Sequence, residues 1–203
     1  MRVSDCVGCE DFPCVDVKHD GYIIPEVEIA PEKVRMILIS EAAPADPNDY
    51  YYAGTQPHFE QTTLQAFQQA AIEVASLQDL LDMGIYFTTA VKCSKTGYGI
   101  KAATIKACSQ ILADELNLFP NAQAYLLMGD VSIKAINYIA QREAAGRAIP
   151  ASSTYKIRGG TYFFRGKRAF PSYLQVGPSF GIEKSKQRMI AEDIAAALAI
   201  IGR

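Results

Sequence analysis

The chain has 203 residues, of which 49% are hydrophobic and 21% are charged, and its formal net charge at pH 7 is −2. This length favours one domain with a sizeable core over two domains. We therefore expect a single domain over residues 1–203, with residues 1–31 as a thiol-bearing segment packed on it. The slightly acidic balance excludes nucleic-acid binding through overall positive charge, so such binding would need a local basic face.

The sequence also indicates the compartment in which the protein is expected. No apolar stretch is long enough for a membrane helix, and the first residues have no apolar signal segment. We expect a cytoplasmic monomer that makes no membrane contact. In a reducing compartment, the five cysteines of the chain point to metal or redox chemistry rather than to structural disulfides.

The first motif in chain order is Cys6-x-x-Cys9, and further thiols follow at Cys14, Cys93 and Cys108. Thiolates at this spacing can share a metal ion or an iron–sulfur cluster. Cys93 and Cys108 bracket a loop between an expected strand and helix, so a cluster that uses both pairs would pin the N-terminal segment to this loop. Taken alone, Cys108 also fits the apolar face of a helix as a small buried hydrophobe.

Short apolar runs alternate with amphipathic stretches along the rest of the chain. Runs at 34–40, 84–91 and 122–129 are typical of buried parallel strands, and a fourth strand is expected near 169–176, after a hairpin. Helices are expected at 58–75, 101–118, 130–146 and 183–202. This alternation predicts a three-layer α/β/α fold with a central, mostly parallel four-stranded sheet. Ligands of such sheets bind at the carboxyl ends of the strands.

The order and spacing of these motifs resemble the iron–sulfur uracil-DNA glycosylases, often called family four. The segments that carry the resemblance are the early Cys-x-x-Cys, SEAAPAD at 40–46, YFTTAVKC at 86–93, AYLLMGDVSIKAI at 124–136 and AFPSYLQVGPS at 169–179. They cover nearly the whole chain in the family's order. The resemblance implies a uracil-DNA glycosylase-like fold and a [4Fe–4S] cluster, with Cys14 as a surplus thiol. It assigns the cluster to Cys6, Cys9, Cys93 and Cys108, and zinc on the same thiols is the lesser alternative.

Two positions depart from the family's pattern. Thr89 stands where the family has an asparagine that reads the uracil edge, and Gly177 stands where it has a histidine. A threonine hydroxyl cannot make the paired contacts of an amide. The two histidines of the chain, His19 and His58, lie elsewhere and are interpreted as exposed residues.

Hydrolysis of an N-glycosidic bond needs a carboxylate that orients water and a group that stabilises the leaving base. The resemblance places Glu41 at the family's acidic position, and Asp46 is a second candidate on the same loop. The alternative for Asp46 is turn chemistry beside proline and asparagine. For base binding, Thr89 is joined by Phe59, which is similar to the phenylalanine under the flipped base but one residue out of register. The alternative for Phe59 is a core residue at a helix start.

Two basic stretches are candidates for contacts with DNA phosphates. The first leads into the last helix and comprises Gly177, Pro178, Ser179 and Lys184. The second lies in the hairpin and comprises Arg165, Lys167 and Arg168. We expect both on the side of the sheet where the strands have their carboxyl ends, with an ordinary solvated surface as the alternative for the hairpin.

We therefore expect an enzyme similar to uracil-DNA glycosylases, which removes a flipped, deaminated base from DNA by hydrolysis of the N-glycosidic bond. The alternative is a non-catalytic iron–sulfur module that binds nucleic acid on the same fold. The absent asparagine and histidine favour the alternative, whereas Glu41 and the thiols favour the enzyme.

Overall fold

The computed structural model describes residues 1–97, 99–177, 180–181 and 183–203. Within these residues, one six-stranded sheet has the order β1-β3-β2-β4-β6-β5. Its strands are β1 (Val17–Lys18), β2 (Met36–Ala43), β3 (Ile85–Lys95), β4 (Ala124–Met128), β5 (Tyr162–Phe164) and β6 (Lys167–Ser172). β3, β2, β4 and β6 are parallel neighbours, whereas β1 and β5 are antiparallel edge strands.

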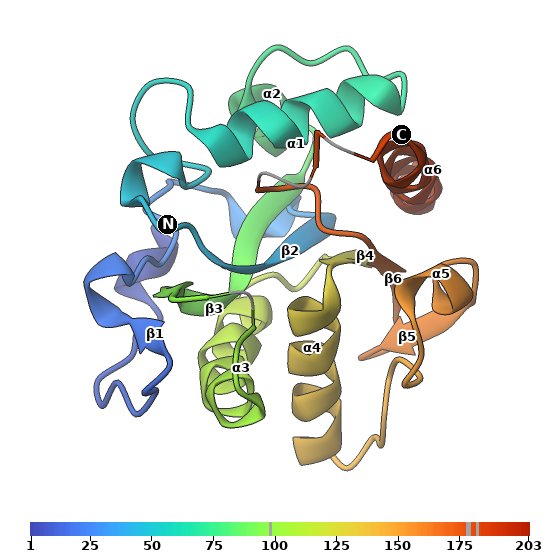
Figure 1. Ribbon diagram of the computed structural model, residues 1–203. Helices are drawn as coiled ribbons and strands as arrows, with labels where there is room; N and C mark the ends of the chain where they lie inside the picture. The colour runs from blue at the N-terminus through green and yellow to red at the C-terminus, as the bar shows by residue number, and fades with distance from the viewer. Residues whose placement is uncertain (98, 178–179, 182) are drawn as a thin grey trace.

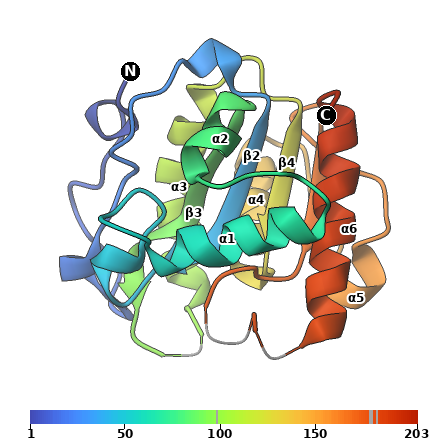
Figure 2. The ribbon, with the colours of Figure 1, turned by 90° about the horizontal axis from the view of Figure 1, so that it is seen from above.

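Helices cover both faces of this sheet, which gives three layers (Figure 1). They are α1 (His58–Gln69), α2 (Leu77–Asp82), α3 (Ala102–Asn117), α4 (Asp130–Arg142), α5 (Thr154–Ile157) and α6 (Lys184–Ile200). α3 and α4 pack on one face, and α1, α2 and α6 pack on the other (Figure 2). None of the helices in the described ranges has the length and apolar character needed to cross a membrane.

The expected α/β class is confirmed, but the sheet has six strands in the described part of the chain rather than four. The four expected strands form its parallel centre. The additional β1 is only two residues long, and its pairing of Val17 with Lys95 joins segments far apart in the sequence. β5 forms the hairpin that was expected before the fourth strand, and it reverses into β6 through Arg165 and Gly166, whose φ angles are 50° and 72°. β1 is too short to leave a hydrophobic period in the sequence.

Strand β2 illustrates why the centre of the sheet was predictable. Met36 and Leu38 face the core under α1 and α6, whereas Ile37 and Ile39 face the core under α3 and α4. All four side chains are fully buried. A strand with helices on both faces must be apolar at every position, and this requirement produces the continuous run in the sequence.

Residues 1–31 pack on β3 and α3 beyond the edge of the parallel sheet (Figure 1). The backbone N–H of Ile23 donates to the carbonyl of Lys92 at 2.8 Å. The Asp16 carboxylate accepts from the backbone N–H of Lys101 at 2.6 Å and from the Thr104 hydroxyl. These contacts hold the irregular N-terminal segment against the β3–α3 connection.

Candidate functional site

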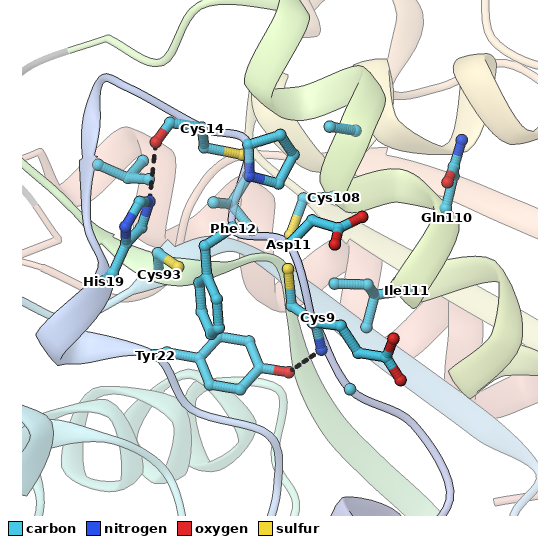
Figure 3. A pocket seen from close by; sticks show the side chains of 16 residues that line it. Cys9, Asp11, Phe12, Cys14, His19, Tyr22, Cys93, Cys108, Gln110 and Ile111 are labelled. Carbon is cyan, nitrogen blue, oxygen red and sulfur yellow. Dashed lines mark hydrogen bonds between the residues drawn. The ribbon is translucent and has the colours of Figure 1, made fainter.

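Four cysteines from three parts of the chain line one cavity of about 460 Å³, which we call the thiol cavity. Cys9 and Cys14 come from the N-terminal segment, Cys93 from β3 and Cys108 from α3. Figure 3 shows their side chains around this space, together with Tyr22. The thiol cavity therefore joins the N-terminal segment to the strand and the helix on which it packs.

Hydrogen bonds hold the backbone of Cys9 and Cys14 and reach the sulfur of Cys108. The N–H of Lys92 donates to Sγ of Cys108 at 3.2 Å. The N–H of Cys9 donates to the Tyr22 hydroxyl at 2.8 Å (Figure 3). The His19 ring lies 2.8 Å from the carbonyl of Cys14, through Nε2. The N–H of Lys92 is the kind of donor that stabilises a sulfur carrying negative charge.

The thiols also influence one another electrostatically. Burial raises the pKa of Cys93 to about 12, and the neighbouring Cys108, Cys14 and Cys9 add to the effect. Burial raises the pKa of Cys108 to about 11, against the lowering effect of the Lys92 N–H. Burial likewise raises the pKa of Cys14. The raised pKa values of Cys14, Cys93 and Cys108 mark a place that a cation would stabilise, because bound metal compensates thiolate charge.

The expected ligand set differs from the set that lines the cavity. Cys6 is exposed, and its thiol lies 3.5 Å from the carbonyl of Arg2, outside the cavity. Cys14, which the resemblance left surplus, lines the cavity in its place. Cys6 and Cys9 are close in sequence, but the direction of each side chain depends on how the irregular segment packs.

The fit of a metal group to this cavity can be tested by its donors. Four thiols are the donor set of [4Fe–4S] clusters and of structural zinc sites. Within the described residues, no group of three or more histidine, cysteine, aspartate or glutamate side chains is arranged to hold a metal ion. A zinc ion needs its four sulfurs about 2.3 Å from one point, whereas a cubane cluster binds each thiolate at a different iron. The chemistry of the donors therefore fits both groups.

Two further cavities lie at the carboxyl edge of the parallel strands. The first, of about 430 Å³, has mainly apolar walls that include Ala42, Pro44 and Val176, and we call it the apolar cavity. The second, of about 470 Å³, includes Asp130, Lys134, Lys186 and Tyr173, and we call it the polar cavity. Glu41 and Leu174 line both. The expected placement of a ligand site at this edge is therefore matched by two adjoining cavities.

Glu41 stands at the boundary of these cavities in a defined orientation. Its Oε2 accepts from Nζ of Lys95 at 2.9 Å, and its Oε1 accepts from the N–H of Val131, in the first turn of α4, at 3.4 Å. Gly129 has φ +91°, and a Cβ built on it would lie 2.6 Å from Oε1 of Glu41. The carboxylate is thus held by a cation and a helix start, and only a glycine leaves room for it.

The other expected catalytic and base-binding residues are distributed differently. Asp46 is exposed and caps a short 3-10 turn, accepting from the N–H of Asn48 at 2.9 Å. Its alternative turn role is confirmed, and it does not line either cavity. Phe59 does line the apolar cavity, but it is 7% exposed and packs on Tyr50 and Tyr51, as its core alternative expected.

Thr89 does not reach either cavity. It is fully buried, and its Oγ1 has no hydrogen-bond partner among the described residues. Its register neighbour Ser40 accepts or donates a 2.5 Å hydrogen bond with the Tyr51 hydroxyl, and Gln175 donates to the same hydroxyl at 2.9 Å. Thr89 is therefore enclosed beside this buried network and cannot contact a base in this conformation.

Three titratable side chains of the apolar cavity were not among the expected site residues. They are Asp49, His58 and Lys95. The expectation of an exposed His58 is wrong in part, because the residue is half-buried and faces a cavity at the start of α1. The sequence contained a hint of this position, because His58 directly precedes Phe59, the residue that was expected to contact the base.

The two basic stretches lie at opposite ends of the sheet. Gly177 lines the apolar cavity, and Lys184 is the exposed first residue of α6, whose Lys186 lines the polar cavity. Pro178 and Ser179 lie outside the described residues. The positions of Gly177 and Lys184 agree with the expectation that this stretch lies at the carboxyl edge.

The placement expected for the hairpin is wrong. Arg168 is in register with Ala124, the first residue of β4, so the turn between β5 and β6 is at the amino edge, away from both cavities. Arg165 binds Glu143 at 2.5 Å and Asn117 at 2.8 Å. Arg168 donates to the carbonyl of Tyr162, and Lys167 pairs with Phe164 in the hairpin. The reason is topological, because β6 is parallel to β4 and a turn that precedes β6 must lie at its amino end.

Comparisons of the chain with protein-family models and with curated proteins find no match.

Proposed function

We propose that this protein is a uracil-DNA glycosylase-like enzyme that hydrolyses the N-glycosidic bond of a flipped, deaminated base in DNA. The observation that carries the proposal is Glu41, a carboxylate held by Lys95 and by the start of α4 at the boundary of two cavities. Both cavities open at the carboxyl edge of the parallel strands, where ligands of open α/β sheets bind.

The two cavities suit the two parts of a nucleotide. The apolar cavity, with Ala42, Pro44 and Val176 in its walls, suits the flat face of a base. The polar cavity, with Lys134 and Lys186, suits the sugar and the phosphates that follow it. Glu41 would then lie beside the bond that joins base and sugar.

In the proposed reaction, the N-glycosidic bond breaks with its electron pair on the leaving base. A water molecule adds its oxygen to C1′ of the sugar, and Glu41 orients this water and receives its proton. The ion pair with Lys95 and the N–H of Val131 fix the direction of the carboxylate, so little reorganisation is needed when the reaction begins.

In this proposal, the thiols of Cys9, Cys14, Cys93 and Cys108 hold a [4Fe–4S] cluster, with zinc as the lesser alternative. When bound, the cluster would supply a covalent link between the N-terminal segment, β3 and α3. This link would also stabilise the segment beside the carboxyl edge, because Val17 of β1 pairs with Lys95, the ion-pair partner of Glu41. The thiols therefore support the site without taking part in the reaction.

A non-catalytic iron–sulfur module that binds nucleic acid is the second candidate. The observations in its favour are the burial of Thr89 away from the cavities and the lack of a side chain at Gly177. Such a module would bind DNA with the same edge of the sheet but would release no base.

The test is a base-release assay on a panel of oligonucleotides, each with one deaminated base, in single and double strands. We expect the protein to release at least one base, and Glu41→Gln to lower the rate at least about 100-fold with DNA affinity retained. Asp46→Asn is the matched comparison, because Asp46 caps a turn outside the cavities. It should keep turnover close to that of the unmodified protein.

Two results would contradict the proposal in different ways. Unchanged turnover in Glu41→Gln would remove this residue from the mechanism while leaving the activity. DNA binding without release of any base from the panel would favour the non-catalytic module.

A further inference from the structure

We infer that His58, at the start of α1, contacts the leaving base and donates the hydrogen bond that stabilises it. This inference rests on the proposed function and names a residue for it. In the pattern that the chain resembles, a histidine occupies the position of Gly177. Gly177 and His58 line the same apolar cavity, so an imidazole from α1 can serve the space that Gly177 leaves without a side chain.

Among the described residues that line the apolar cavity, the side chains able to donate an N–H hydrogen bond are His58 and Lys95. Lys95 is engaged by Glu41 at 2.9 Å. The imidazole of His58 makes no hydrogen bond within the described part of the chain; only the backbone carbonyl of His58 does, accepting from the Thr62 hydroxyl at 3.0 Å. The ring is therefore available to a ligand, while its backbone is held.

The neighbouring aromatic residue is placed for a different task. Phe59 is 7% exposed, and its ring lies 5.3 Å from that of Tyr51 and 6.4 Å from that of Tyr50. These contacts seat α1 on the core. His58, one residue earlier and half-buried, takes the more accessible position at the cavity. The packing of Phe59 thus fixes the start of α1, where His58 lines the cavity.

The chemistry follows from the proposed reaction. When the N-glycosidic bond breaks, its electron pair leaves negative charge on the base. An N–H of His58 that points at this base stabilises the charge as it develops, and water and Glu41 complete the reaction at C1′. The charged groups that also face this cavity are Glu41, Asp49 and Lys95.

The experiment compares two substitutions on the substrate that the unmodified protein cleaves best. His58→Phe keeps a flat ring and removes the donor, whereas His58→Gln keeps a donor and removes the ring. We expect His58→Phe to lower kcat about 100-fold or more, and His58→Gln to lower it less, because one oxyanion-type donor is worth about 100- to 1000-fold. Gln65→Phe, at an exposed position of α1 outside the cavity, controls for a phenylalanine on this helix and should keep the rate.

The comparison with Gln65→Phe separates chemistry from structural damage. Full turnover in His58→Phe would overturn the role of His58 and leave the proposed function intact.

A binding measurement tests His58 even if no base is released. The chain has two histidines, so the imidazole signals of His58 and His19 can be followed separately by NMR. Oligonucleotides with 2′-fluoro-2′-deoxyuridine or 2′-fluoro-2′-deoxyinosine, which resist cleavage, should shift the signal of His58 and leave that of His19 in place. A shift of the His58 signal without any base release would support the contact with the base and reject the glycosylase activity. An unmoved His58 signal with both bound probes would reject the contact.

Discussion

Lys92 and Glu115 form an ion pair in which neither side chain is exposed to solvent. Nζ of Lys92 also donates to the hydroxyl of Thr88 and to the backbone carbonyl of Thr89, each at 2.7 Å. Oε1 of Glu115 accepts from Tyr86 at 2.6 Å and from Thr88 at 2.7 Å. A buried charge pair is tolerated when its remaining donors and acceptors are satisfied, and this network satisfies them. It joins α3 to β3 directly before Cys93.

Removal of one charge from this pair should be more harmful than removal of both. We expect Lys92→Met to lower the free energy of unfolding by about 3–5 kcal/mol, because the carboxylate of Glu115 is left buried without its cation. The double variant Lys92→Met with Glu115→Gln should recover part of that loss. Urea unfolding of both proteins measures the difference. A double variant less stable than the single one would contradict this account.

At the scale of elements, the site depends on the junction between β4 and α4. Gly129 ends the strand with φ +91°, and its N–H donates to the carbonyl of Ser172 at 3.0 Å. Because it has no side chain, Glu41 can lie against the junction and reach the N–H of Val131. The direction of α4 and the orientation of the carboxylate are therefore set by the same turn.

The effect of this junction on Glu41 can be separated from backbone strain. Gly129→Ala would combine a strained φ with a Cβ 2.6 Å from Oε1 of Glu41. Gly146→Ala has a comparable φ of +75° but nothing within 4 Å of its Cβ. We expect both variants to lose about 1–3 kcal/mol of stability, and only Gly129→Ala to lose base release. Equal rates in the two folded variants would show that Glu41 tolerates displacement.

At the scale of the whole molecule, the N-terminal segment connects the thiol cavity to the carboxyl edge of the parallel strands. It supplies Cys9 and Cys14 to the cavity and, through Val17, pairs with Lys95 beside Glu41. The carboxyl edge carries the cavities and the start of α6, whereas the hairpin with Arg165 extends from the amino edge. The proposed function therefore places DNA at the carboxyl edge, whereas the hairpin packs at the amino edge.

Serine substitutions should identify the thiols that hold a cluster. We expect Cys14→Ser to lose iron, sulfide and the brown colour of anaerobically purified protein, and Cys6→Ser to keep them, because Cys6 lies outside the thiol cavity. Loss of the cluster should also make residues 1–31 more sensitive to proteases, since their link to β3 and α3 is weakened. Metal and sulfide content, with mass spectrometry of the digest, are the measurements. Loss of iron in Cys6→Ser alone would restore the Cys6-x-x-Cys9 assignment.

Much of the fold could be predicted because burial on two faces imposes a local pattern. The runs that contain Met36 to Ile39 and Leu126 to Met128 are apolar at successive positions, and the parallel order puts their carboxyl ends together. Glu41 could be predicted as a site residue for the same reason, since it follows such a run. Helix α2 and strand β1 are too short to leave a comparable period, and they were not expected.

The sequence by itself determined the α/β class, the edge of the sheet at which the two cavities lie and the presence of thiols that can be brought together. Tertiary structure alone decided that Cys14 rather than Cys6 lines the thiol cavity, that His58 faces the apolar cavity and that Thr89 does not. Periodicity reports only whether a residue of a regular element is buried. The direction of a side chain in an irregular segment, or at the first residue of a helix, is set by packing against residues far away in the sequence, and no local pattern records that packing.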